Sequence, residues 1–457
     1  MVAVQTPRVA PLAGLPTDDT YEAVKRRESS ARTYAATFEA VFESGAGIRM
    51  RDESGREIID CLACAGALPL GHNHPEVRDA LMRFLDSGHV QQVLDLTTPA
   101  KRAFVDELFG LLPAAWADRA KIQFCSPSGS DAVEAAMKLV RFATGRQTIL
   151  AFHGAYHGMT GGALAAMGNL GPKAALSGAG HVHFAPFPYR YRCPFGSGGE
   201  DTDRLSIQYL TTLLGDPESG VTRPAAVIVE VVQGEGGCIP VSDAWLRDLR
   251  QLTQEHDIPL VIDEVQTGFG RTGTMFAFER AGIVPDVLVL SKAVGGGFPL
   301  AVVVYDQALD GWPRGMHAGT FRGNQIAMVA GKVTMEILRR DRLAEHAGDM
   351  GAMMMEGLRR IASEHPELGD VRGRGLMIGV EIVAPGPGVA RPRQDGALAA
   401  AIKRAAFEHG LLLETGGRHG AVLRMLPPLI VTRSDVGAIL DRLDAAVTAA
   451  KRQTRLR

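Results

Sequence analysis

The stretch of residues 259–299 constrains the fold of this chain more than any other. It contains two short apolar runs, residues 260–262 and 287–290, and polar residues follow each run: Asp263 comes after the first, and Lys292 comes shortly after the second. Short apolar runs of this kind predict buried parallel strands. Because ligands of open α/β sheets bind at the carboxyl ends of the strands, we expect Asp263 and Lys292 to face one crevice.

A carboxylate and a lysine that meet in one crevice suit a particular cofactor. Pyridoxal phosphate needs a lysine for its covalent attachment and an acid that keeps its pyridine nitrogen protonated. Each residue taken alone is equally well explained as a turn residue or a solvated side chain. The glycines at 295–297 would let the backbone pass close to a ligand, and this favours the cofactor interpretation.

Two longer segments of the same stretch, IDEVQTGFGRTG and DVLVLSKAVGGGFPL, resemble the signature of the class III, or ω-amino-acid, aminotransferases. These are pyridoxal-phosphate enzymes of fold type I. The resemblance implies an α/β fold like that of aspartate aminotransferase, with a mostly parallel central sheet in a large domain and a small α+β domain. It also implies that Asp263 pairs with the pyridine nitrogen, that Gln266 contacts the phenolic oxygen and that Lys292 binds the cofactor covalently.

The composition agrees with a large globular enzyme. The chain has 457 residues, of which 46% are apolar and 22% charged, as in ordinary globular proteins. A net charge of −2 gives no electrostatic reason to expect nucleic acid or an anionic membrane as a partner. We find no apolar run of about 18 residues and no secretory signal. The five cysteines, an odd number, favour free thiols, so we expect a cytoplasmic protein.

Two other motifs raise the question of a metal or redox site. Cys61 and Cys64 form a single C-x-x-C with apolar flanks, which favours buried structural cysteines. His72 and His74 lie in GALPLGHNHPEV without carboxylate or cysteine partners at ligand spacing, so we expect loop histidines. The sequence therefore predicts no metal site.

The segment FCSPSGSDAVEAAMKLVRFATG predicts a strand end, a turn and a helix. A glycine and a serine at a helix N-terminus offer free N–H groups and the positive end of the helix dipole to an anion. From the residues alone, an ordinary helix cap at Ser128 or Ser130 explains this pattern as well as an anion site does. In the family this stretch holds the cofactor phosphate, and the resemblance assigns that role to Gly129 and Ser130.

Three further segments carry roles implied by the resemblance. In FHGAYHG, Tyr156 would stack on the pyridine ring with His157 beside it. In HAGTFRGNQ, Thr320 would bind the phosphate of the neighbouring subunit's cofactor, which implies a homodimer with two composite sites. Glu235 would pair with Arg424 while the amine donor is bound and release it for a dicarboxylate, which a guanidinium clamps through two hydrogen bonds. An ordinary surface ion pair is the alternative for Arg424.

We expect three parts along the chain. Residues 1–65 would be an N-terminal arm and the hairpin segment of the small domain, 66–330 the large cofactor-binding domain, and 331–457 the C-terminal small domain. Within these parts the patterns predict the following elements: a loose arm over 1–20, a helix over 21–32, a hairpin of 47–50 and 57–62, an irregular region over 171–224, one strand over 372–383, a helix over 397–408 and a last helix that ends in the basic tail.

The substrate is inferred from finer similarity within the family. DLTTPAKRAF, DCLACAGALPLGHNHP, HAGTFRGNQ and ETGGRHGAVLR are most similar to enzymes that move the terminal amino group of L-2,4-diaminobutyrate to or from 2-oxoglutarate and glutamate, with aspartate 4-semialdehyde as the carbonyl partner. Ornithine, 4-aminobutyrate or lysine ω-aminotransferases are the alternatives, and a racemase or aminomutase of the same fold is a more remote one. A racemase has no need of the switch formed by Glu235 and Arg424. Cys64 stands where many relatives have a glycine.

Overall fold

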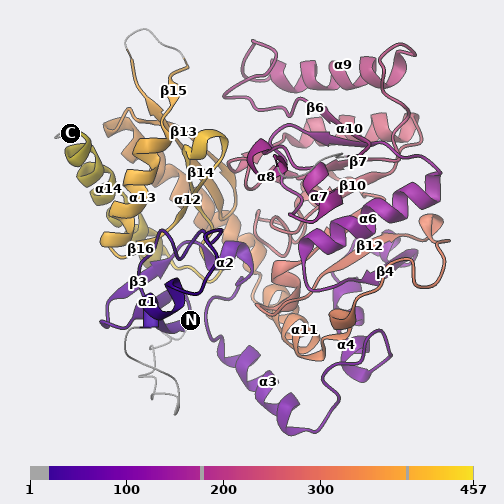
Figure 1. The fold of residues 1–457 in the computed structure, drawn as a ribbon, viewed down its shortest axis with the longest axis horizontal. Helices are drawn as coiled ribbons and strands as arrows, with labels where there is room; N and C mark the ends of the chain where they lie inside the picture. Colours follow the sequence, from indigo (N-terminus) through magenta and orange to yellow (C-terminus); the bar gives the residue numbers. More distant parts are fainter. Residues whose placement is uncertain (1–19, 175–179, 387–390, 456–457) are drawn as a thin grey trace.

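The computed structural model describes residues 20–174, 180–386 and 391–455. These residues form a large sheet flanked by helices and, beside it, a group of smaller sheets and helices that includes the C-terminal part of the chain (Figure 1). The arm predicted for residues 1–20 lies outside the described ranges, except for Thr20. Across these ranges, every helix is too short or too polar to cross a membrane.

The large sheet confirms the predicted α/β class with a mostly parallel central sheet. Its strand order is β4-β12-β11-β10-β7-β5-β6, and only β12 is antiparallel to its neighbours. The two apolar runs that opened the sequence analysis are β10 and β11, which pair in parallel. The strands span Ala120–Phe124 (β4), Val302–Asp306 (β12), Val287–Leu290 (β11), Leu260–Asp263 (β10), Ala226–Val229 (β7), Ile149–Phe152 (β5) and Val182–Ala185 (β6).

Both faces of this sheet are buried. Successive strand residues point to opposite sides, and apolar residues pack on each side. In β11, Leu288 and Leu290 pack in one apolar cluster, and the two valines pack in a second cluster together with helix α6 (Gly129–Thr144). The strand therefore contains no polar residue before its end. Polar side chains first appear at Ser291 and Lys292, at the carboxyl end of the sheet.

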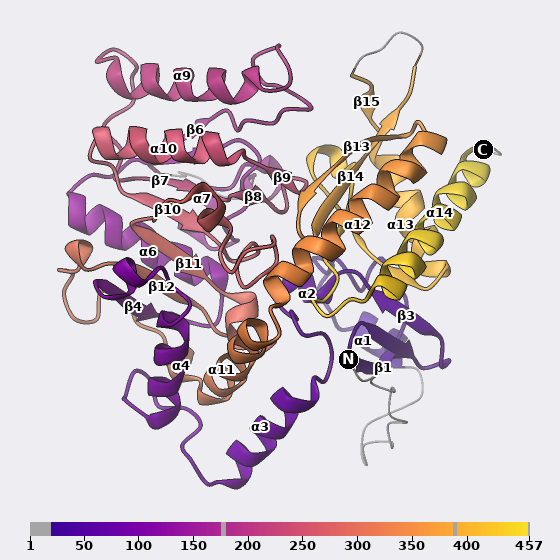
Figure 2. The same cartoon turned by 180° about the vertical axis from the view of Figure 1, so that it is seen from behind.

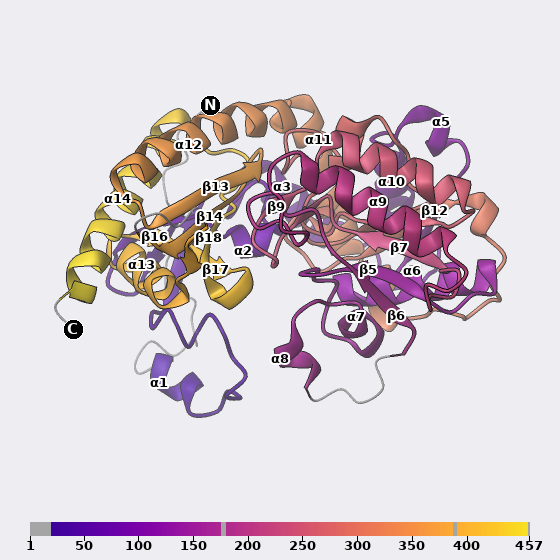
Figure 3. The same ribbon diagram turned by 90° about the horizontal axis from the view of Figure 1, so that it is seen from above.

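Helices cover the large sheet on its two sides, with α9 and α10 on one side and α6 and α7 on the other (Figure 3). Helix α11 packs against α3, α4 and the short η2 turn that begins with Lys292. The remaining helices of this part are α2 (Ala63–Gly66), α3 (Pro75–Asp86), α4 (Pro99–Phe109), α5 (Ala114–Ala117), α7 (Gly161–Ala165), α8 (Leu170–Lys173), α9 (Asp201–Gly215), α10 (Asp243–Glu255), α11 (Gln325–Arg340), and the 3-10 turns η1 (Ala277–Ala281), η2 (Lys292–Gly295), η3 (Gln307–Leu309) and η4 (Thr320–Gly323).

The N-terminal strands and the C-terminal part of the chain lie together, as seen from behind in Figure 2. The predicted hairpin is β2 and β3, and β3 pairs in parallel with β16. A second sheet has the order β13-β14-β18-β17, with β15 paired to β14. The elements are α1 (Thr20–Lys25), β1 (Phe42–Ala46), β2 (Arg49–Asp52), β3 (Glu57–Asp60), β8 (Val232–Gln233), β9 (Ile239–Pro240), α12 (Leu343–Glu364), β13 (Leu368–Arg374), β14 (Met377–Ala384), β15 (Arg393–Gln394), α13 (Gly396–Glu408), β16 (Leu411–Leu412), β17 (Glu414–Gly416), η5 (Arg418–Gly420), β18 (Val422–Met425) and α14 (Arg433–Arg455).

Three predictions of local structure were wrong. The helix expected over 21–32 ends at Lys25, and soon afterwards the Ser29 hydroxyl accepts a hydrogen bond from the Ala31 N–H at 3.2 Å, a local bond that competes with the helix. The region 171–224 contains the 15-residue helix α9, whose buried side includes Thr202 and Ser206. These small polar residues hide the apolar period that would have revealed it.

The third wrong prediction concerns residues 372–383, which form parts of two antiparallel strands rather than one. β13 and β14 are joined by a tight turn at Gly375, whose φ is +53°. A Cβ atom there would lie 2.5 Å from the Arg271 carbonyl oxygen, so only glycine fits. The helix expected over 397–408 is confirmed as α13.

Candidate active site

A cavity of about 180 Å³ lies at the carboxyl ends of β7, β10 and β11. It brings together most of the residues predicted for the site: Gly129, Ser130, Tyr156, His157, Glu235, Asp263, Gln266 and Lys292. Ser128, Gly158, Glu230, Val265 and Ser291 complete its lining. The crevice expected at the carboxyl ends of these strands is therefore present.

Asp263 ends β10 and forms a buried pair with His157. Asp263 Oδ2 lies 2.7 Å from His157 Nδ1, and Oδ1 accepts a hydrogen bond from the Val265 N–H at 3.0 Å. Burial lowers the pKa of His157, but the hydrogen bond to Asp263 and the charges of Asp263 and Glu230 together outweigh it and raise the pKa above its ordinary value. The Asp263 carboxylate is thus fixed by His157 and the Val265 N–H in a position suited to hold a positively charged ring nitrogen.

Lys292 begins the η2 turn directly after β11 and has a φ of +52°. Burial lowers the pKa of its amine, although the carboxylates of Glu235 and Asp263 act in the opposite direction. A lowered pKa increases the fraction of neutral amine, the form that can act as a nucleophile or accept a proton.

The glycines that follow Lys292 do not have the role expected from the sequence. None of Gly295, Gly296 and Gly297 lines the cavity. A Cβ atom on Gly296 would lie 2.6 Å from the Ala330 carbonyl oxygen of α11, and φ at this position is +60°. Gly296 therefore allows the backbone to pass close to helix α11.

The N-terminus of α6 forms another wall of the cavity. Ser128 is the helix cap and accepts a hydrogen bond from the Ser130 N–H, so the capping interpretation holds for this serine. The Ser130 hydroxyl accepts a hydrogen bond from the Met159 N–H at 3.1 Å. Gly129 and Ser130 both face the cavity, and the positive end of a 16-residue helix therefore points at a space that suits an anion.

Glu230 is a site residue that no sequence pattern singled out. It follows β7, is 7% exposed, and accepts hydrogen bonds from the N–H groups of Tyr156 and Gly234, both at 2.9 Å. Burial raises its pKa to about 7. Glu230 thus joins the loop of Tyr156 to the loop of Glu235. A charged residue directly after a buried apolar strand was the only available signal.

Arg424 does not line the cavity but contacts two residues that do. It lies on β18 with its side chain fully buried, 2.6 Å from Glu235 Oε1 and 3.0 Å from Gln266 Oε1. Gln266 uses its amide nitrogen to bind the Ala65 carbonyl oxygen at 3.0 Å. The predicted contact between Glu235 and Arg424 is therefore present, and the alternative of a surface pair is excluded for Arg424.

A wider hollow of about 1030 Å³ adjoins the cavity, because Tyr156 and Glu235 line both. Its other walls include Thr415, Gly416 and Arg418. A small molecule could reach Lys292 from this side, past Glu235.

Thr320 lies apart from the other predicted residues. It is exposed at the start of η4 and does not line the cavity of its own chain. The preceding loop is held to α6 by His317, whose Nε2 lies 2.9 Å from Asp131 Oδ2. These two residues and Cys125 have potential ligand atoms within 4.8 Å of one another, but the Lys138 amine lies 3.3 Å from His317 Nδ1. A cation in that position disfavours a metal ion.

The cysteine prediction was half right. Cys61 is buried, whereas Cys64 is exposed. Residues 63–65 all have φ between +46° and +55°, the left-handed region that disfavours residues with a Cβ atom. His72 is a loop residue as expected and contacts Asp60 at 3.0 Å.

Comparisons with known proteins agree with this geometry. Residues 29–447 match the family model for Aminotransferase class-III. The chain is 53% identical over 426 residues to a diaminobutyrate--2-oxoglutarate aminotransferase of Rhizobium meliloti, covering 92% of this chain and 91% of the relative. It is 46% identical over 436 residues to an enzyme of the same name from Haemophilus influenzae, covering 94% of each.

A solved structure is similar over the same extent. The amine transaminase of an uncultivated Pseudomonas species, determined in its PLP-bound form, superposes with a TM-score of 0.82 at 27% identity and covers 93% of this chain and 98% of its own. The similarity agrees with the predicted fold type I.

Proposed function

Since the chain belongs to the class III aminotransferases and is a pyridoxal-phosphate-dependent enzyme, we propose that it moves the terminal amino group of L-2,4-diaminobutyrate to 2-oxoglutarate, and the reverse. Aspartate 4-semialdehyde and glutamate would be the products. The names of two relatives with 53% and 46% identity support this choice of substrates. The structural observation that carries the proposal is the Glu235–Arg424 pair beside Lys292, because it fits an enzyme whose two substrates differ in charge.

The residues that line the cavity include a carboxylate, a lysine, an aromatic ring and a helix N-terminus, which are the groups that pyridoxal phosphate needs. We propose that Asp263 holds the ring nitrogen, that Tyr156 stacks on the ring with His157 behind Asp263, and that Gly129 and Ser130 bind the phosphate. Gln266 lies in the same lining and would contact the phenolic oxygen. His157 is held through Nδ1, which lies 2.7 Å from Asp263 Oδ2, while its Nε2 is buried and has no hydrogen-bond partner among the described residues.

Pyridoxal phosphate, when bound, supplies an electron sink for the carbon that carries the amino group. Lys292 is the residue that holds and moves the proton in this proposal. Its buried Nζ, with a lowered pKa, can accept a proton from the substrate carbon and return it. The Asp263 carboxylate, whose Oδ2 lies 2.7 Å from His157 Nδ1, would stabilise positive charge on the ring nitrogen.

Glu235 and Arg424 would adapt one site to two substrates. With the amine donor, Glu235 neutralises the buried guanidinium at 2.6 Å. With a dicarboxylate, the substrate can take the place of Glu235, because the planar guanidinium binds a carboxylate through two parallel hydrogen bonds. Glu235 is the exposed member of the pair, with 35% of its side chain accessible, and so it is the member that can move.

The experiment is a single-turnover titration of the holoenzyme with diaminobutyrate, ornithine, 4-aminobutyrate and glutamate, monitored by the cofactor absorbance. We expect fast conversion by diaminobutyrate and glutamate. If ornithine or 4-aminobutyrate reacted as fast as diaminobutyrate, the substrate assignment would be refuted. Loss of the cofactor band in Lys292→Ala is the control for the assigned lysine.

Glu235→Ala tests the exchange of partners. We expect it to slow the reaction with diaminobutyrate more than the reaction with glutamate, because the side-chain carboxylate of glutamate can replace the lost partner at 2.6 Å from Arg424 and diaminobutyrate has no side-chain carboxylate. Glu218→Ala, at an exposed loop position, is the matched control. Equal losses with both substrates would contradict the proposed exchange.

We also propose that the protein is a homodimer with composite sites in which Thr320 reaches the phosphate of the neighbouring subunit. Exposed apolar side chains gather on loops that contact one another, and this supports the proposal. Leu94, Leu96, Phe298 and Phe321 are 37–65% exposed. The Gln325 N–H donates to the Gln91 carbonyl oxygen, and the Asn324 side-chain amide donates to the Pro299 carbonyl oxygen. These bonds join the loops, and a patch of this kind favours an interface.

Phe321→Asp would place a charge in that patch. In sedimentation we expect the variant to shift toward monomer and to lose cofactor affinity together with dimerisation. Phe142→Asp, at another exposed phenylalanine, should leave the assembly unchanged. A Phe321→Asp variant that stayed dimeric would count against this interface.

A further inference from the structure

Arg424 is paired with a second carboxylate besides Glu235. Glu414 lies directly opposite Arg424 in the β17–β18 ladder, and its Oε2 is 3.5 Å from the Arg424 Nη1 atom. Glu235 approaches the same nitrogen at 2.6 Å. One fully buried guanidinium therefore faces two carboxylates, and burial raises the pKa of Glu414.

The Glu414 carboxylate is incompletely bonded. Its Oε2 is buried and accepts no hydrogen bond from the described residues, although 17% of the side chain remains exposed. Besides Arg424 and Glu235, the charged or titratable groups near it are Tyr34 and Lys403. No side-chain ion pair within 4 Å joins Lys403 to it in the described part of the chain, and burial lowers the pKa of Lys403. A buried, partly bonded carboxylate favours the arrival of a cationic partner.

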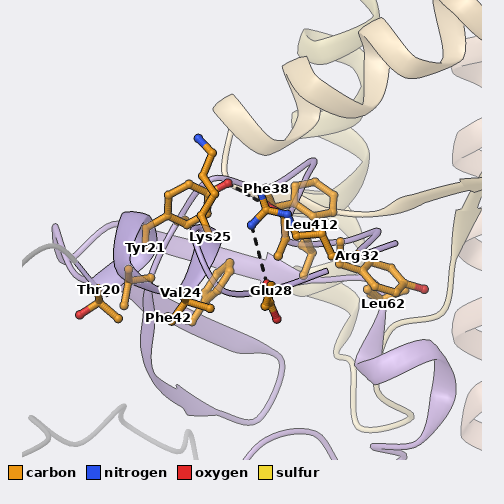
Figure 4. Close-up of a pocket in the computed structure, with 14 residues that line it drawn as sticks. Thr20, Tyr21, Val24, Lys25, Glu28, Arg32, Phe38, Phe42, Leu62 and Leu412 are labelled. Atoms are coloured by element: carbon orange, nitrogen blue, oxygen red, sulfur yellow. Dashed lines mark hydrogen bonds and ion pairs between the residues drawn. The ribbon is translucent and has the colours of Figure 1, made fainter. Parts of the chain in front are cut away.

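Tyr34 comes from a segment that is fixed over the C-terminal sheet. Phe38 of this segment packs with Leu412, immediately before the strand of Glu414, and the Tyr21 hydroxyl donates to the Ala35 carbonyl oxygen at 2.9 Å. Figure 4 shows Tyr21, Phe38 and Leu412 around the hollow that this segment covers. Burial and the Glu414 charge raise the pKa of Tyr34, so its hydroxyl stays a hydrogen-bond donor.

A series of electrostatic interactions joins Lys292 to Glu414 through Arg424. Lys292 interacts electrostatically with Glu235 and Arg424, and Arg424 contacts Glu414. Glu414 itself lines neither the cavity nor the wide hollow, but the next two residues, Thr415 and Gly416, line the hollow through which a substrate would enter. A diamine whose terminal amino group is at Lys292 would therefore extend its other end toward this region.

We propose that Glu414, with the Tyr34 hydroxyl beside it, binds the α-ammonium group of the diamine substrate and thereby selects diamines over ω-amino acids that lack this group. The inference rests on the proposed function and extends it to a specificity-determining residue. 4-Aminobutyrate differs from diaminobutyrate only in lacking the α-amino group. A hydrogen bond between charged groups is strong enough to change the preference by about 10- to 100-fold.

The test is the ratio of kcat/KM for diaminobutyrate to kcat/KM for 4-aminobutyrate in the holoenzyme. We expect Glu414→Gln to lower this ratio by about 10- to 100-fold and to change the glutamate half-reaction by less than about threefold. Tyr34→Phe, which keeps the carboxylate and the ring, should lower the same ratio by about two- to tenfold. Glu408→Gln, an exposed glutamate at the end of α13, is the control.

Several results would overturn the inference. If Glu414→Gln reduced the diaminobutyrate and glutamate reactions equally, Glu414 would only position Arg424. An unchanged ratio in either variant would also refute it. If Glu414→Gln failed to fold, Tyr34→Phe would decide.

Failure of the proposed substrate gives a different result. If the wild type used ornithine instead of diaminobutyrate, the same ratio would be measured for ornithine against 5-aminopentanoate, its counterpart without the α-amino group. A drop in that ratio would support the role of Glu414 even though the substrate assignment had failed. A wild type that converted no diamine would refute both.

Discussion

Glu230 should make the stability of the protein depend on pH, and Glu230→Gln should remove this dependence. The folded protein raises the pKa of Glu230 from an ordinary 4.5 to about 7, chiefly by burial. An acid with a raised pKa binds its proton more tightly in the folded state than in the unfolded state. The folded state therefore loses stability as the pH rises from about 4.5 to about 7, and no further loss follows above that range.

The expected size follows from the pKa values and from the two hydrogen bonds. Each pKa unit corresponds to about 1.4 kcal/mol, so full ionisation of Glu230 costs about 3 kcal/mol. A glutamine carbonyl can accept from only one of the Tyr156 and Gly234 N–H groups, and the lost bond costs about 1–3 kcal/mol at every pH. Glu230→Gln should thus be less stable than the wild type at pH 5 and close to it at pH 8.

The assay is thermal unfolding of both holoenzymes at pH 5, 6, 7 and 8. For a chain of this size about 1 kcal/mol corresponds to about 1 °C, so the Tm difference between the two proteins should change by about 3 °C across the range. Glu264, whose pKa is also raised to about 7 by burial, is present in both proteins and cancels. Glu255→Gln, at an exposed position, should show a constant difference. A constant difference for Glu230→Gln would refute the reasoning.

Two other substitutions test the backbone around the site. In Gly158→Ala, where φ is +128°, the new Cβ atom would lie 2.1 Å from the Ser130 hydroxyl oxygen. Equilibrium dialysis should show that this variant binds the cofactor more than about tenfold more weakly. Gly161→Ala, whose new Cβ atom meets nothing within 4 Å, should bind the cofactor as the wild type does. Cys64→Gly should stabilise the protein by up to about 1 kcal/mol, because glycine adopts the φ of +51° at this position without steric strain. Cys64→Ser, which keeps a Cβ atom, should leave Tm unchanged. A less stable Cys64→Gly would show that no strain is stored there.

The residues that the sequence revealed are those at strand ends. Asp263 and Lys292 follow apolar runs that have no other explanation than buried strands, and in a parallel sheet the ends of neighbouring strands meet. The cap at Ser128 likewise depends on local pattern alone. The sequence could therefore predict this half of the site from short segments.

The other half depends on contacts between distant segments. Glu230 binds the Tyr156 N–H, 74 residues away in the chain, and Glu414 meets Arg424 only because β17 and β18 pair. No local period or motif encodes these contacts. Cys64 illustrates the same limit, because its apolar neighbours suggested burial while a left-handed turn places it at the surface.

The residues proposed to hold the cofactor and those proposed to select the substrate lie on different sheets. The lysine and the acid stand on the large sheet, where alternating apolar residues on two buried faces fix the strand ends. Arg424 and Glu414 stand on the C-terminal sheet, and Tyr34 stands on the segment packed against it. Arg424 also contacts Gln266, but substitutions at Tyr34 and Glu414 can alter which substrate is held without disturbing the groups that hold the cofactor. Substrate preference should therefore respond to changes at Tyr34 and Glu414 while the absorbance of the bound cofactor stays constant.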